Sequence, residues 1–219
     1  MHHIILNMRI ELLKRKILNA GALWISFTKL IPDWFRLGKK SFVLDCGANV
    51  GYITKLLAST GATVIAFEPD PVAFQQLAKR CSNKKNITLI RKGVWDKNST
   101  IELYAHKETK GNEASFTVGS SIVGEKLNVS TEKALSIEVV DLVEFMQQQN
   151  RKIDLVKLDV EGAEIAILKR ILATEAWHLF NRMYVETHET KIPSQLEELN
   201  WIKNQLKERN IKHIKLNWI

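Results

Sequence analysis

Cysteine is scarce in this sequence of 219 residues, which contains only Cys46 and Cys81. Two cysteines cannot form the disulfide framework of a small secreted domain. Neither lies in a C-x-x-C pair, so a zinc ribbon is also excluded. We therefore expect a reducing, cytoplasmic setting.

Long hydrophobic runs are also missing. The longest uncharged run near the N-terminus, residues 17–28, has twelve residues, whereas a membrane-spanning helix needs about 20. No small-x-small cleavage site follows it, so we expect no signal peptide. Apolar residues make up 45% of the chain and charged residues 26%, which is ordinary for a globular protein. The length predicts one domain with a terminal extension.

The excess of positive charge is confined to one end. Residues 1–40 contain eight basic and two acidic residues, and the other 179 residues contain 24 basic and 22 acidic ones. The body of the protein therefore lacks a basic stripe with interleaved aromatics, and we expect no nucleic-acid partner. Apolar residues at helical spacing predict a helix over residues 4–30, which Pro32 ends. Residues 1–40 are thus expected to form a basic helical extension.

From residue 41 to residue 219, strand-like and helix-like segments alternate, which predicts an α/β domain. We expect a Rossmann-like, mostly parallel, doubly wound sheet with helices on both faces. Residues 96–140 are polar and interrupt the alternation, so they are interpreted as an inserted loop or hairpin beside the substrate. The predicted strands are 41–45, 63–68, 87–90, 153–159, 182–187 and 212–218, and the predicted helices are 52–59, 72–81, 142–149, 163–173 and 195–209.

A loop with two glycines joins the first predicted strand to the first helix. Gly47 and Gly51 permit a tight turn and a close approach to a ligand. The spacing is not that of a dinucleotide fingerprint, because Asn49 replaces its second glycine. Asp45 at the strand end would repel a pyrophosphate and attract an ammonium group. The loop therefore predicts S-adenosylmethionine rather than NAD as cofactor.

Two further segments extend the predicted cofactor site. Glu68 ends the second strand, 23 residues after Asp45, where an acid accepts hydrogen bonds from ribose hydroxyls. Gly93 and Val94 follow the third strand, where we expect the adenine.

A charged cluster follows the strand at 153–159. Lys157 lies among apolar neighbours, and a buried lysine needs a carboxylate partner. Asp159 and Glu161 would point the same way if the strand continued. Glu164 begins the next helix, where an acid is favourable with the helix macrodipole.

The next strand ends in Glu186 and His188, which share one face by the period of two. Adjacent strand ends would bring both beside Asp159. We therefore list as candidate catalytic residues Lys157, Asp159, Glu161 and His188, with Asp159 or His188 as the general base. Alternatively, Asp159, Glu186 and His188 would bind a divalent metal ion such as Mg²⁺ or Mn²⁺.

Together these motifs resemble the FkbM family of methyltransferases over roughly residues 41–190. The matching segments are Asp45–Gly51, Glu68-Pro69, Val139-Val140-Asp141, Lys157-x-Asp159-x-Glu161-Gly162-x-Glu164 and Glu186-x-His188. The resemblance implies S-adenosylmethionine-dependent O-methylation of a sugar, glycan or other small-molecule hydroxyl. The sequence departs from the family at Lys169-Arg170, where members often have Lys-Gly.

Two alternatives remain open at this point. One is an RNA ribose 2′-O-methyltransferase, with a Lys-Asp-Glu set at the strand ends, although the nearly neutral body argues against it. The other is a catalytically silent binding domain of the same fold, against which the acids at every strand end argue.

Residues 1–40 also contain Trp24, Phe27, Trp34 and Phe35. Basic groups beside aromatics suit a membrane surface or a glycolipid substrate, whereas an amphipathic helix more often covers a cleft or a partner subunit in a homodimer. We favour the covering helix and expect no co-sedimentation with anionic vesicles at low salt. Deletion of residues 1–30 should then lower stability or substrate affinity. Vesicle binding that weakens as salt rises would instead establish the membrane surface as partner, because salt screens exposed charges.

Overall fold

A computed structural model describes residues 28–106, 129–188, 192–216 and 218. The chain divides into two compact units, residues 1–36 with residue 219, and residues 37–218. Within the described ranges, no helix has both the length and the hydrophobicity to cross a membrane.

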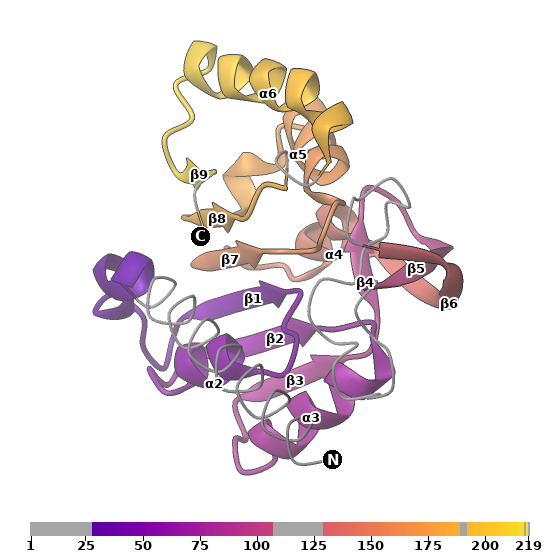
Figure 1. The fold of residues 1–219 in the computed structure, drawn as a ribbon. Coiled ribbons are helices and arrows are strands. Elements are labelled where there is room, and N and C mark those ends of the chain that lie inside the picture. Colours follow the sequence, from indigo (N-terminus) through magenta and orange to yellow (C-terminus); the bar gives the residue numbers. More distant parts are fainter. Residues whose placement is uncertain (1–27, 107–128, 189–191, 217, 219) are drawn as a thin grey trace, which may run out of the picture. The chain divides into compact units, whose positions relative to one another are not determined.

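A six-stranded sheet forms the centre of the second unit (Figure 1). Every strand pair in it is parallel, which confirms the parallel sheet predicted from the alternation. The strands, in sheet order, are β3 Ile87–Ile90, β2 Thr63–Phe67, β1 Phe42–Cys46, β7 Leu155–Leu158, β8 Met183–Val185 and β9 Ile214–Lys215.

Burial explains why these segments form strands. All five residues of β1 and all four of β7 are buried, as expected for central strands covered on both faces. The predicted strand at 153–159 is longer than β7, because Ile153 makes only an isolated bridge to Phe180 and the chain turns away at Asp159.

Five α-helices connect the strands. Helix α2 packs against α3, and α5 packs against both α4 and α6. Right-handed crossovers place these two groups on opposite faces of the sheet, which is the doubly wound arrangement. The helices are α2 Tyr52–Ala58, α3 Pro71–Cys81, α4 Leu142–Gln148, α5 Glu164–Ala173 and α6 Leu196–Glu208, with short 3₁₀ helices at Ala176–Leu179 and Pro193–Gln195.

Aspartates begin two of these helices. Asp70 accepts hydrogen bonds from the amides of Val72 and Ala73 at the start of α3, and Asp141 does the same at the start of α4. These N-caps satisfy amides that have no partner within the helix.

A second, three-stranded sheet occupies the region interpreted as an insertion. Strand β6 Val129–Asp141 pairs in parallel with β4 Gly93–Trp95 and antiparallel with β5 Ser99–His106. The hairpin alternative for 96–140 is thus correct for its ends, while residues 107–128 lie outside the described residues.

The described part of the N-terminal extension is a helix at residues 28–34. Pro32 lies within this helix, so the expectation that Pro32 ends it was wrong. The rest of the helix predicted over residues 4–30 lies outside the described residues.

Candidate active site

The site lies where the direction of strand addition reverses. From β1 the chain adds β2 and β3 on one side, and β7, β8 and β9 lie on the other. In open α/β sheets, ligands bind beyond the carboxyl ends of the strands at such a reversal. The ends of β1, β2, β7 and β8 bring together the predicted acids.

The loop after β1 turns through left-handed backbone conformations. Gly47 has φ +80°, Asn49 +49° and Gly51 +87°. A Cβ atom at Gly47 would overlap the carbonyl oxygen of Asp159, so only glycine lets this loop lie against the turn after β7. The glycine spacing in the sequence therefore reflects contact between two loops as well as a tight turn.

A buried lysine connects these two loops. Lys157 is 3% exposed, and its Nζ lies 3.0 Å from Asp159 Oδ2 and 3.5 Å from Asp45 Oδ1. Nζ also donates a hydrogen bond of 2.6 Å to the Gly47 carbonyl. Burial by itself lowers the pKa of Lys157, but Asp159 and Asp45 raise it above its ordinary value. The carboxylate partners expected for this lysine are therefore present.

Asp45 is fully buried rather than open to a ligand. One of its oxygens accepts a hydrogen bond of 2.6 Å from the hydroxyl of Thr54 in α2, and the other faces Lys157. In this structure Asp45 acts on the cofactor loop, and its predicted contact with a cofactor ammonium stays a prediction.

Glu68 directly follows β2 and is held by backbone amides. Its two oxygens accept hydrogen bonds from Asn49 N at 2.7 Å and Asp70 N at 2.9 Å. The carboxylate is therefore fixed beside the Gly47–Gly51 loop. Each of its oxygens can accept a second hydrogen bond, because a carboxylate oxygen has two lone pairs, and this suits a ribose diol.

Gly93 and Val94 do not form the expected loop around an adenine. They belong to β4, and Val94 is 2% exposed within the main hydrophobic core. A Cβ atom at Gly93 would lie 2.9 Å from the side chain of Val139. This glycine is needed for packing against β6, so the prediction that these two residues contact the cofactor is corrected.

The turn between β7 and α5 is held by Glu164. This side chain is 1% exposed, and its oxygens accept hydrogen bonds from Val160 N at 2.9 Å and Gly162 N at 2.8 Å. Between these amides, Glu161 adopts φ +56°, a left-handed conformation that is costly for a non-glycine residue. The sequence explained Glu164 by the macrodipole alone and missed this role.

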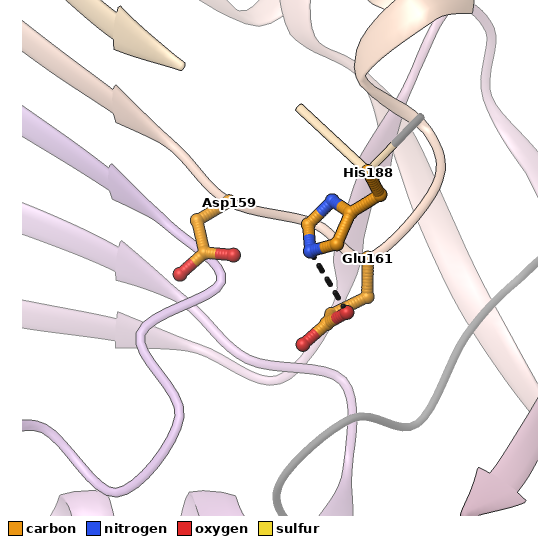
Figure 2. A group of neighbouring side chains, drawn as sticks. All are labelled: Asp159, Glu161 and His188. Atoms are coloured by element: carbon orange, nitrogen blue, oxygen red, sulfur yellow. Dashed lines mark ion pairs between the residues drawn. The ribbon is translucent and has the colours of Figure 1, made fainter. Parts of the chain in front are cut away.

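His188 lies beside three carboxylates and is 2% exposed. Its Nε2 is 3.0 Å from Glu161 Oε2 and 3.6 Å from Glu186 Oε1, and its Nδ1 is 3.1 Å from Glu164 Oε1. Neither ring nitrogen has a partner in hydrogen-bond geometry, so these contacts are ion pairs. Figure 2 shows the imidazole next to Asp159 and Glu161.

These contacts change the pKa values of the cluster. Burial by itself lowers the pKa of His188, but Glu161 and Glu164 raise it to about 10. Burial raises the pKa of Glu186 to about 7, with a further contribution from Asp159. At neutral pH, the imidazole is therefore protonated in the protein alone.

A pocket of about 510 Å³ borders the same turn. Its lining combines one aromatic ring with charged and amide side chains, among them Trp95, Asp96, Lys169, Arg170, Gln195 and Glu198. Gln195 donates a hydrogen bond of 2.9 Å to the carbonyl of Gly162, which attaches the pocket wall to the residue after Glu161. Such a volume is sufficient for a small ligand.

A doubly wound sheet, a glycine turn after β1 and acids at the ends of β1, β2 and β7 define the class I methyltransferases with a Rossmann-like fold, which use S-adenosylmethionine. The sequence matches the model of the methyltransferase FkbM domain over residues 45–210. The chain belongs to the FkbM family and is an S-adenosylmethionine-dependent methyltransferase.

Three similar proteins illustrate this membership. Methyltransferase sdnD of Sordaria araneosa is 27% identical over 206 residues, covering 79% of this chain and 76% of sdnD. Hexuronic acid methyltransferase AglP of Haloferax volcanii is 28% identical over 156 residues, covering 71% of this chain and 59% of AglP. A structure of an rRNA-methylase candidate from Clostridium thermocellum aligns with a TM-score of 0.46 at 13% identity, covering 81% of this chain and 77% of that one.

Gly47→Ala should weaken binding of S-adenosylhomocysteine at least tenfold, measured by calorimetry, because the methyl group would separate the cofactor loop from Asp159. The left-handed φ alone should lower the free energy of unfolding by about 1–2 kcal/mol. Gly38→Ala is the matched control, since a Cβ atom there meets nothing within 4 Å. Unchanged binding by Gly47→Ala would contradict the contact between the loops.

Cofactor affinity should depend on the ionisation of Glu68. Burial raises its pKa to about 7, although the amides of Asp70 and Asn49 oppose this. Only the carboxylate accepts protons from both ribose hydroxyls, so affinity should rise as the pH increases from about 6 to about 8. Calorimetry across this range should show a dependence that Glu68→Gln lacks. The variant also accounts for titration of the cofactor amine, and identical profiles would exclude this role.

Proposed function

We propose that the chain transfers the methyl group of S-adenosylmethionine to a hydroxyl oxygen of a sugar or another small molecule. The observation that carries this proposal is the cluster of Asp159, Glu161, Glu186 and His188 beside the cofactor loop. An alkyl hydroxyl is a poor nucleophile, and a base or a cation must help as the new bond forms. This cluster offers both kinds of group at the edge of the sheet where the acceptor would approach the cofactor.

Within the cluster, Asp159 is the preferred general base. His188 has a pKa of about 10 in the protein alone, and an imidazolium cannot accept a proton. Lys157 holds Asp159 by one oxygen, Oδ2. The hydroxyl proton would pass to the carboxylate while the oxygen–carbon bond forms and the carbon–sulfur bond of the cofactor breaks.

The 510 Å³ pocket supports a sugar as acceptor. Trp95 offers a ring for the apolar face of a sugar, and Asp96 contributes a buried Oδ1 that lacks a hydrogen-bond partner. Carboxylates and amides pair readily with hydroxyl groups. A relative named as a hexuronic acid methyltransferase also supports this acceptor class.

Incubation with methyl-labelled S-adenosylmethionine and a panel of sugars, uronic acids, polyketides and RNA tests the proposal. We expect label on a hydroxyl of a sugar or another small molecule, located by mass spectrometry and NMR. Label on RNA ribose would replace this function with the RNA alternative. If the cofactor binds and no acceptor is labelled, a silent binding domain is the better description.

Asp159→Asn and His188→Gln should each reduce turnover about 100-fold or more, because general acid–base catalysis contributes on this scale. Affinity for S-adenosylhomocysteine should stay close to wild type, since neither side chain holds the predicted ribose site. Glu208→Gln, at the far end of α6, should have no effect on turnover. Full activity in both cluster variants would remove these residues from the mechanism.

A further inference from the structure

The carboxyl edge of the sheet contains more negative than positive groups. Its two basic groups, Lys157 and His188, contact a larger set of carboxylates, namely Asp45, Asp159, Glu161, Glu164 and Glu186. Even with both basic groups protonated, negative charge remains. Such an excess in a partly buried site favours binding of a cation.

The unsatisfied imidazole of His188 is an independent sign of a ligand. Both of its nitrogens are buried and lack a hydrogen-bond partner, although buried polar groups are normally hydrogen-bonded. Nε2 faces the side of the ring where Asp159 and Glu161 lie (Figure 2). A metal ion bound among these three side chains would provide the partner that Nε2 lacks.

We propose that Asp159, Glu161 and His188 bind one divalent cation of the Mg²⁺ or Mn²⁺ type. One ligand atom from each residue lies within 4.8 Å of the others, so a small inward movement would bring all three to a common ion. Two carboxylates with one imidazole suit Mn²⁺, and Mg²⁺ also prefers oxygen ligands. The role of the cation rests on the proposed function, because a bound hydroxyl loses its proton more readily.

Glu164 is the positioning residue of this site. Its Oε1 lies 3.1 Å from Nδ1 of His188, and two backbone hydrogen bonds hold its carboxylate in place. Metal-binding histidines commonly donate their second ring N–H to a carboxylate, which directs the other nitrogen to the metal. Glu161 thereby replaces Glu186, which the sequence predicted as a ligand and which lies 3.6 Å from Nε2.

Titration of the full chain with Mn²⁺, followed by electron paramagnetic resonance, tests the site without an acceptor. We expect one bound ion, and an at least tenfold weaker affinity in Asp159→Asn, Glu161→Gln and His188→Gln. Glu164→Gln should weaken Mn²⁺ binding about 10- to 100-fold. Glu186→Gln is the matched control and should bind Mn²⁺ within about threefold of wild type.

Absence of bound Mn²⁺ in the wild type at millimolar concentration would overturn the proposal. Equal losses in Glu186→Gln and Glu161→Gln would overturn the set of ligands. If His188→Gln does not fold, pulsed resonance on the wild type replaces it: coupling to one imidazole nitrogen supports the site, and its absence overturns it. Methyl transfer is assayed separately, so Mn²⁺ binding without turnover would refute the proposed function alone.

Discussion

The ammonium group of Lys157 is the interaction on which the site depends. It is buried at the end of β7 and contacts the side chains of Asp45 and Asp159 and the carbonyl of Gly47. These three partners come from β1, from the loop after it and from the turn after β7. A buried charge without partners is strongly unfavourable, so the lysine keeps these segments together. The acids can therefore lie side by side even though they repel one another.

Much of the fold could be predicted because its signals are local. The alternation of apolar segments with helical spacing gave the parallel sheet, and β3 was predicted with its observed bounds. Strand β4 was missed, because three residues including Gly93 show no period, and pairing with β6 brings in residues more than 40 positions away. The same non-local pairing turned an expected adenine loop into part of the core.

The site was predicted at the level of composition and not of contacts. Adjacent strand ends placed Asp159 near Glu186 and His188, since their order in a parallel sheet follows from the chain. The contact between Glu161 and His188 depends on a left-handed φ at Glu161, which no sequence pattern indicates. Glu164 was explained by its helix position, yet its partner His188 lies 24 residues further along the chain.

The close approach of Gly47 to the backbone of Asp159 has a thermodynamic consequence. Two loops in such contact cannot shift independently, so a ligand that moves the Gly47–Gly51 loop also moves Asp159. Any change that one bound molecule makes in the affinity for the other must then be reciprocal. Cofactor and acceptor would bind to this enzyme as coupled ligands, and the product S-adenosylhomocysteine would alter the affinity for the methylated product by the same factor as the reverse.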